Sequence, residues 1–329
     1  MNTGDAGNIL IIRLSSLGDI LLTTPFLRSL KNLYPEKKID FLIRNEYADI
    51  LKFNPYVNEV LLYKRDDNRE LFERLKEKKY DVVVDLQNNL RSQKVIKAVR
   101  AQAFSFSKRS FDKFLLVKFK INRLQSAPQI PVRYASSIPG FQLDDKGLDL
   151  FLPENVSIDL KAEDNYIAFC PGSRHFTKMW PPEYFTRLGR LLQKEGFNII
   201  FSGGKSDREI CRRLSGEIPG SLDMSNDDDL FATAAVMKRC RAVVCNDSGM
   251  MHTACALGVP VVAIFGSTVK EFGFTPYKNK NLILENNSLS CRPCSHIGRE
   301  KCPLGHFKCM LEITPEAVMD NVKRILDLS

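Results

Sequence analysis

The 329-residue sequence lacks the features of several common protein classes. Its longest apolar runs, residues 9–12 and 259–265, are far shorter than the roughly 20 residues of a membrane-spanning helix. The first ten residues show neither the basic region nor the apolar region of a signal peptide. The patterns GxxxxGK[ST] and GxGxxG do not occur, which disfavours an NTPase or a dehydrogenase. We therefore expect a cytoplasmic protein of another enzymatic or binding class.

No cysteine occurs before Cys170, although the chain has nine. Five of them lie in apolar or helical contexts and suit small core residues of a reduced compartment; these are Cys170, Cys211, Cys240, Cys245 and Cys255. The other four follow the spacing C-x2-C-x7-C-x6-C and are Cys291, Cys294, Cys302 and Cys309. This spacing is compatible with a small structural zinc site. Free or redox-labile thiols are the alternative interpretation.

Positive charge is concentrated in the first part of the chain. Residues 1–150 hold 26 Lys and Arg against 18 Asp and Glu, within a net charge of +9 for the whole sequence. The cations are densest in one stretch that also carries several phenylalanines and leucines, with Lys108, Arg109, Lys113, Lys118, Lys120 and Arg123. Such a stretch would attract a polyanion or an anionic membrane surface. A solvated basic helix is the alternative, and no nucleic-acid-binding signature is present.

Strand-like and helix-like segments alternate along the chain. Apolar runs at 8–13, 38–43, 59–63 and 81–86 are separated by helical patterns, which predicts a parallel sheet covered on both faces. The pattern breaks near residues 125–155, where Pro, Ser and Gly are scattered, and then starts again. We therefore predict two doubly wound α/β domains, residues 1–155 and 156–329. The last helix, 315–329, is capped by Thr314 and could pack back on the first domain.

Small or polar residues follow successive strands of the second domain, at 171–174, 202–205, 246–249 and 266–268. Because the carboxyl ends of parallel strands meet at one sheet edge, these loops would surround one crevice. The loop at 246–249 opens into a helix, where free amides suit a pyrophosphate; an ordinary helix cap is the alternative. Arg174 and Lys178 could neutralise phosphate charge without a metal.

Asp19 occupies a corresponding place in the first domain. It follows the first strand in the segment Arg13-Leu-Ser-Ser-Leu-Gly-Asp19, at a predicted helix start. Its carboxylate is either a helix cap or a general base that faces a ligand.

Four segments together resemble the lipopolysaccharide heptosyltransferase family, glycosyltransferase family 9. They are residues 13–30, 83–92, 171–181 and 246–268, with the sequences RLSSLGDILLTTPFLRSL, VVDLQNNLRS, PGSRHFTKMWP and NDSGMMHTACALGVPVVAIFGST. The resemblance implies a GT-B architecture with two Rossmann-like domains facing a central cleft. It implies a metal-independent, inverting transfer of heptose from ADP-heptose to the inner core of lipopolysaccharide, with no cofactor. The tail cysteines resemble the heptosyltransferase II branch.

The resemblance also assigns roles to individual residues. Asp19 matches the catalytic base. The residues that match the donor site are Ser173, Arg174, Lys178, Asp207, Asp247, Ser248, Gly249 and His252, although His252 would also suit a core position. On the acceptor side we expect Gln87, Asn88, Arg91 and, in the basic stretch, Lys120. The family commonly has Thr where this chain has Ser248, so a hydroxyl is kept.

The resemblance implies two partners, a nucleotide-sugar donor and an anionic glycolipid acceptor. We expect peripheral contact with the cytoplasmic face of the inner membrane and no nucleic acid. Two rival functions stay open at this point. One is a related transferase that uses another nucleotide sugar or acceptor glycan, and the other is a non-catalytic nucleotide-sugar binder.

Overall fold

The computed structural model describes residues 7–156, 158, 160 and 165–327. The prediction that the chain has no signal peptide concerns its first residues, and residues 1–6 lie outside the described part. The last two residues of the predicted final helix, 328 and 329, also lie outside it. The chain divides into two compact units. The first comprises Met1–Arg109 and Pro128–Phe151, and the second comprises Ser110–Ala127 and Leu152–Ser329.

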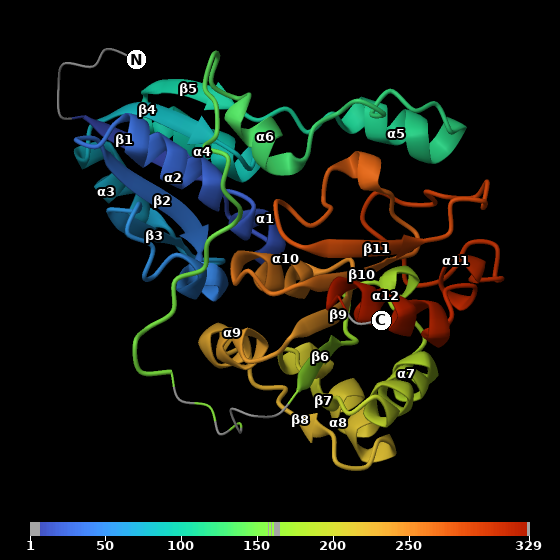
Figure 1. Cartoon of the computed structure of the whole chain (residues 1–329). Helices are drawn as coiled ribbons and strands as arrows, with labels where there is room; N and C mark the ends of the chain where they lie inside the picture. Colours follow the sequence, from blue (N-terminus) through green and yellow to red (C-terminus); the bar gives the residue numbers. More distant parts are fainter. Residues whose placement is uncertain (1–6, 157, 159, 161–164, 328–329) are drawn as a thin grey trace. The chain divides into compact units, whose positions relative to one another are not determined.

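The first unit is built on a five-stranded parallel sheet with the order β3-β2-β1-β4-β5. Its strands are β1 (Asn8–Ile12), β2 (Lys38–Arg44), β3 (Glu59–Tyr63), β4 (Tyr80–Asp85) and β5 (Gln102–Ser105). Its helices are α1 (Leu17–Leu21), α2 (Thr24–Leu33), η1 (Asn45–Ile50), α3 (Arg69–Glu77), α4 (Leu90–Val99) and α6 (Ile130–Ala135). The central strand β1 is buried along nearly its whole length, because helices cover both faces of such a sheet (Figure 1).

The second unit contains a six-stranded parallel sheet with the order β11-β10-β9-β6-β7-β8. Its strands are β6 (Tyr166–Cys170), β7 (Asn198–Phe201), β8 (Leu222–Asp223), β9 (Ala242–Asn246), β10 (Val261–Phe265) and β11 (Asn281–Glu285). Its main helices are α5 (Ser110–Phe119), α7 (Pro182–Lys194), α8 (Arg208–Glu217), α9 (Leu230–Lys238), α10 (Gly249–Ala256) and α12 (Pro315–Ile325). Short turns complete it, at η2 (Phe176–Lys178), η3 (Lys205–Asp207), η4 (Lys270–Phe272) and α11 (Lys308–Leu311).

The two doubly wound parallel sheets confirm the predicted fold class, whereas the grouping of segments differs from the predicted boundary. The segment Ser110–Ala127 groups with the second unit, although the sequence placed it in the first. A small apolar cluster holds it there, in which Leu116 and Leu124 pack with Phe272. The final helix α12 packs on α7 and on β9, β10 and β11, all within the second unit. Thr314 caps it as predicted, accepting a hydrogen bond from the Ala317 amide at 3.3 Å.

Each sheet changes its direction of winding at one point. In the first unit β2 and β3 lie on one side of β1, and β4 and β5 lie on the other. In the second unit β7 and β8 lie on one side of β6, and β9, β10 and β11 lie on the other. Ligands of open α/β sheets bind at such switch points, outside the carboxyl ends of the strands. The loops after β1 and β4, and those after β6 and β9, are therefore where a ligand is expected.

In the described residues, no helix is both long enough and apolar enough to cross a bilayer.

Candidate functional site

Asp19 lies at the switch point of the first unit, in the short helix α1 after β1. Its Oδ2 accepts hydrogen bonds from the Ser16 hydroxyl at 2.9 Å and from the Ser16 amide at 3.3 Å. Its Oδ1 forms an ion pair with an Arg13 Nη atom at 2.6 Å. The side chain keeps 20% of its surface exposed, and a carboxylate offers about four lone-pair sites. Asp19 therefore both caps the turn and keeps capacity to accept a proton.

Arg13 fixes this carboxylate from the protein interior. The residue is buried, and its guanidinium also donates to the Leu86 carbonyl at 2.6 Å and to the Ser15 carbonyl at 2.8 Å. Burial lowers the pKa of Arg13, but the charge of Asp19, its hydrogen bond to Arg13 and the nearby Tyr134 and Asp85 together outweigh burial, so the pKa is raised. The cation is therefore permanent, and it is held in a single geometry by three acceptors.

The loop after β4 and the start of α4 carry three of the predicted acceptor-side residues. Gln87 Oε1 accepts from the Leu14 amide at 2.8 Å, so Gln87 braces the loop that carries Asp19. The Asn88 side-chain amide donates to the Phe106 carbonyl at 2.9 Å. Arg91, in the first turn of α4, is exposed. Gln87 and Asn88 thus shape the site through the backbone, whereas Arg91 presents a charge to solvent.

Lys108 and Tyr134 complete the surroundings of Asp19. The sequence placed Lys108 only in the basic stretch, and Tyr134 was not predicted. Burial lowers the pKa of Lys108, with the nearby Arg13 charge adding to this, while Asp85 and Asp19 act in the opposite direction. The Tyr134 ring lies 5.7 Å from the Arg13 guanidinium carbon, and its hydroxyl is buried without a hydrogen-bond partner. Burial raises the pKa of this phenol. The first unit therefore holds a half-buried cation and a proton-bearing hydroxyl beside the candidate base.

In the second unit, Lys178 and Asp247 form the central pair. Lys178, at the end of η2, lies 2.8 Å from Asp247 Oδ2, and the Thr268 hydroxyl donates to the same oxygen at 2.6 Å. Asp247 follows β9, and Thr268 follows β10. Neighbouring Asn246 locks the η2 loop in place, because its Oδ1 accepts from the Trp180 amide at 3.0 Å. The ammonium group therefore lies at the carboxyl ends of β6, β9 and β10, which are neighbours in the sheet.

The helix α10 begins directly beside this pair. Ser248 is its N-cap, yet its hydroxyl makes no cap hydrogen bond, and Ser248 Oγ is buried without a partner. Gly249 starts the helix, and His252, one turn later, is only 3% exposed. Buried polar atoms are normally satisfied. A free hydroxyl next to unpaired helix amides is therefore a place for an anionic ligand.

Ser173, Arg174 and Asp207 lie on the loops after β6 and β7. Ser173 is half-buried and Arg174 is exposed. Asp207 packs directly against two glycine backbones, since a Cβ on Gly172 would lie 2.0 Å from its Oδ1 and one on Gly203 would lie 2.6 Å from its Cβ. Burial raises the pKa of Asp207. Asp207 therefore fills the space beside Gly172, on the loop after β6, and beside Gly203, on its own loop after β7.

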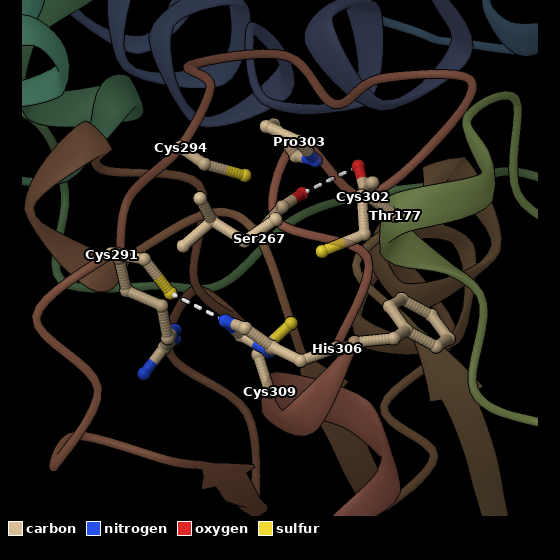
Figure 2. A pocket seen from close by; sticks show the side chains of 11 residues that line it. Thr177, Ser267, Cys291, Cys294, Cys302, Pro303, His306 and Cys309 are labelled. Atoms are coloured by element: carbon tan, nitrogen blue, oxygen red, sulfur yellow. Dashed lines mark hydrogen bonds between the residues drawn. The ribbon is translucent and has the colours of Figure 1, made fainter.

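The four tail cysteines come together around one small cavity in the second unit. The cavity has a volume of about 30 Å³ and is lined by residues that include Cys291, Cys294, Cys302, Cys309 and His306 (Figure 2). Cys291 Sγ lies 3.8 Å from His306 Nε2. Within the described chain, however, no three His, Cys, Asp or Glu side chains are placed to hold one metal ion. The geometry thus lends no support to the zinc interpretation, and free thiols stay a prediction.

Lys120 differs from its expected role. Its ammonium group donates to the carbonyls of Pro293 at 2.7 Å, Cys291 at 3.0 Å and Val117 at 3.2 Å. Burial lowers its pKa. Lys120 belongs to the second unit with these partners and supports the cysteine-bearing loop, and its acceptor-side role stays a prediction.

The pairing of Arg13 with Asp19 and of Thr268 with Asp247 was not predicted. Both partners were visible as polar residues just after a strand, at 13 and at 268, and that position is the only signal the sequence offers. Thr268 meets Asp247 because β9 and β10 pair in the sheet, which no local pattern encodes. Arg13 and Asp19, by contrast, lie in the same segment after β1.

Two doubly wound parallel α/β units, with Lys178, Asp247 and the start of α10 at one switch point and Asp19 at the other, have a GT-B-like architecture. The model of glycosyltransferase family 9 (heptosyltransferase) matches residues 68–304. The chain therefore belongs to glycosyltransferase family 9, the heptosyltransferase family.

Individual relatives agree with this assignment. The chain is similar to lipooligosaccharide heptosyltransferase 2 of Haemophilus influenzae, with 24% identity over 97% of this chain and 99% of the relative. Its fold resembles the family 9 glycosyl transferase of Veillonella parvula, with a TM-score of 0.80, 24% identity and 98% of both chains covered. It also resembles an Escherichia coli heptosyltransferase solved with ADP-2-deoxy-2-fluoro heptose, with a TM-score of 0.68, 20% identity, and 96% of this chain and 99% of that one covered.

Proposed function

We propose that the protein transfers heptose from ADP-heptose to the inner core of lipopolysaccharide with inversion at the anomeric carbon. The observation that carries this proposal is the Lys178–Asp247 pair, 2.8 Å apart, beside the unpartnered Ser248 hydroxyl at the start of α10. A fixed cation, a free hydroxyl and helix amides at a switch point suit a diphosphate. The relative solved with a fluorinated ADP-heptose supports the choice of donor.

The donor half needs no metal in this proposal. Negative charge grows on the diphosphate as the bond to the sugar breaks, and preorganised cations and amides stabilise it. Lys178 is held by Asp247, and exposed Arg174 on the loop after β6 adds a second cation. Asp207, beside Gly172 and Gly203, is the candidate contact for the ribose. Ser173 and His252 complete the proposed donor residues. In this mechanism ADP-heptose is a substrate, and the reaction requires no cofactor.

The acceptor half supplies the base. A sugar hydroxyl is a poor nucleophile until its proton starts to leave, and general-base catalysis contributes about 10²–10⁴-fold. Asp19 accepts this proton while the acceptor oxygen bonds to the anomeric carbon and the bond to the diphosphate breaks. Arg13 and Ser16 hold the carboxylate in one orientation. Tight orientation of the base matters, because misplacement by about 1 Å can cost roughly 10²-fold.

The proposed acceptor is an anionic glycolipid. Arg91 is exposed and Lys108 is half-buried beside Asp19, and both suit acidic groups on the acceptor. Gln87 and Asn88 act on the acceptor side by holding the loops around Asp19 through hydrogen bonds to the backbone. Such an acceptor lies at the cytoplasmic face of the inner membrane, where we place the protein as a peripheral component without nucleic acid.

Incubation of the purified protein with candidate donors and acceptors, read by mass spectrometry, tests the proposal. We expect a mass gain of one heptose only with ADP-heptose, and an inverted anomeric configuration by NMR. Preference for a UDP- or GDP-hexose would identify a different transferase of the same family. ADP binding without turnover for any donor, unchanged by Asp19→Asn, would identify a non-catalytic binder.

A further inference from the structure

The helix α5 and the turn after it carry large apolar side chains that nothing in the second unit covers. Phe111 is 65% exposed, Phe114 is 53%, Phe119 is 57% and Ile121 is 49%. We name these four residues the α5 surface. Phe114 and Phe119 already contact each other, with ring centroids 5.8 Å apart. Single exposed apolar residues are ordinary, but a gathered group of aromatics marks an interaction site.

The segment that carries the α5 surface is anchored to the rest of the second unit. The opposite side of the segment is anchored by Leu116 and Leu124, which pack against buried Phe272. Lys113 lies over the Phe274 ring at 5.7 Å, and Lys120 donates to the Cys291 and Pro293 carbonyls. The helix is therefore held in place while its outer aromatics stay in solvent. A partner that covers them does not need to fold the segment first, so little ordering entropy opposes binding.

Charge determines what kind of partner fits. The second unit's segment 110–127 contains four Lys and Arg and one acidic residue, Asp112. Lys118 is exposed next to Phe119. A second copy of this chain would bring two such basic segments together, and like charges repel. Exposed aromatic side chains on a segment with excess positive charge instead match an anionic lipid bilayer, where the rings enter the acyl boundary and cations such as Lys118 meet the headgroups.

We infer that the α5 surface docks the protein on an anionic lipid bilayer, with Phe111, Phe114 and Phe119 inserted. The choice of a bilayer rests on the proposed function, since a glycolipid acceptor resides in one. None of these residues is among those that we propose for the donor site or the acceptor site.

Co-sedimentation of the full chain with vesicles tests this inference. The vesicles are phosphatidylcholine alone or phosphatidylcholine mixed with anionic phosphatidylglycerol, and they contain no glycolipid acceptor. We expect binding to the anionic vesicles, weakened by salt because charge attraction is screened beyond about 8–10 Å. Phe111→Ser, Phe114→Ser and Phe119→Ser combined should lower the partition coefficient by at least about tenfold. Lys118→Glu should weaken binding and reduce its salt dependence.

Leu33→Ser is the matched control, because Leu33 is also 57% exposed but lies on α2 of the first unit. It should bind vesicles like the unchanged protein. The triple variant should keep its ADP-induced stabilisation and its turnover on a deacylated, soluble acceptor, which shows that it is folded. If neither the unchanged protein nor any variant transfers heptose, the proposed function is refuted. Vesicle binding can still be measured in that case, so it tests the inference separately.

Three results would overturn the inference. They are no binding to anionic vesicles, unchanged binding of the triple variant, and equal binding to neutral vesicles. A concentration-dependent dimer that the triple variant abolishes would show that a second copy covers the α5 surface, and would overturn it as well.

Discussion

Replacement of Asp19 by Asn tests the catalytic assignment most directly. The two residues have nearly the same size, but an amide cannot take the acceptor proton. We expect turnover to fall by about 10²–10⁴-fold, which raises the barrier by roughly 2.7–5.5 kcal/mol. ADP affinity should stay unchanged, because Lys178, Asp247 and Ser248 all belong to the other unit.

The same change should also destabilise the first unit, for a reason that the structure supplies. Removing one partner of a buried ion pair costs about 3–5 kcal/mol, because the other charge is left uncompensated. Arg13 is buried, but Asp19 keeps 20% of its side chain exposed and the Arg13 guanidinium keeps two carbonyl acceptors. The asparagine oxygen can still accept from Arg13. We therefore expect a smaller loss, about 1–3 kcal/mol.

Two spectroscopic probes separate these effects. Trp180 is the single tryptophan and is fully buried in the core of the second unit, so its fluorescence follows that unit. In chemical denaturation of Asp19→Asn, the far-UV circular dichroism midpoint should fall while the tryptophan midpoint stays. Ser16→Ala is the matched control. It loses one 2.9 Å hydrogen bond to the same carboxylate but keeps the base, so turnover should change by less than about tenfold.

The assignment is refuted if the folded Asn variant keeps near-normal turnover, because the base then lies elsewhere. A parallel loss of turnover and ADP affinity would instead indicate that Asp19 acts only as a structural cap.

The remaining predictions concern phosphate binding, metal and thiols. Lys178→Ala should weaken ADP binding by about 10–150-fold in calorimetry, because it removes a hydrogen bond from a charged donor. Arg91→Ala should raise only the KM for the acceptor. Equal effects of both changes on both substrates would contradict two separate half-sites. Turnover should survive EDTA, and donor binding that is lost in chelator and restored by Mg²⁺ would contradict a purely protein-based phosphate site. Burial raises the pKa of Cys240 and of Cys255 to about 12, so these thiols should stay protonated and resist iodoacetamide at mildly alkaline pH, while half-exposed Cys291 is alkylated in peptide mapping. Protection of Cys291 that a chelator relieves would instead reveal a bound soft metal.

Local sequence patterns were sufficient for most of the secondary structure. Buried parallel strands appear as short continuous apolar runs, and strand β1, predicted at 8–13, forms at Asn8–Ile12. Thr314 and the following proline fixed the start of the last helix, because capping depends only on adjacent residues. The short or partly exposed strands β5, β8 and β11 escaped prediction, since tertiary pairing forms them and intrinsic pattern does not.

What the sequence determined by itself is the set of small and polar residues that follow the strands, and through them the family. Tertiary structure alone decided how these residues combine. It placed Ser110–Ala127 in the second unit, through burial of Leu116 and Leu124 against a distant Phe272. It brought the Lys120 ammonium group to the carbonyls of Cys291 and Pro293, far along the chain. It also buried Arg13 by bringing β4 beside β1, where the Leu86 carbonyl accepts a hydrogen bond from the Arg13 guanidinium. Each of these outcomes depends on strand order and on contacts between segments far apart in the chain, and no window of neighbouring residues carries that information.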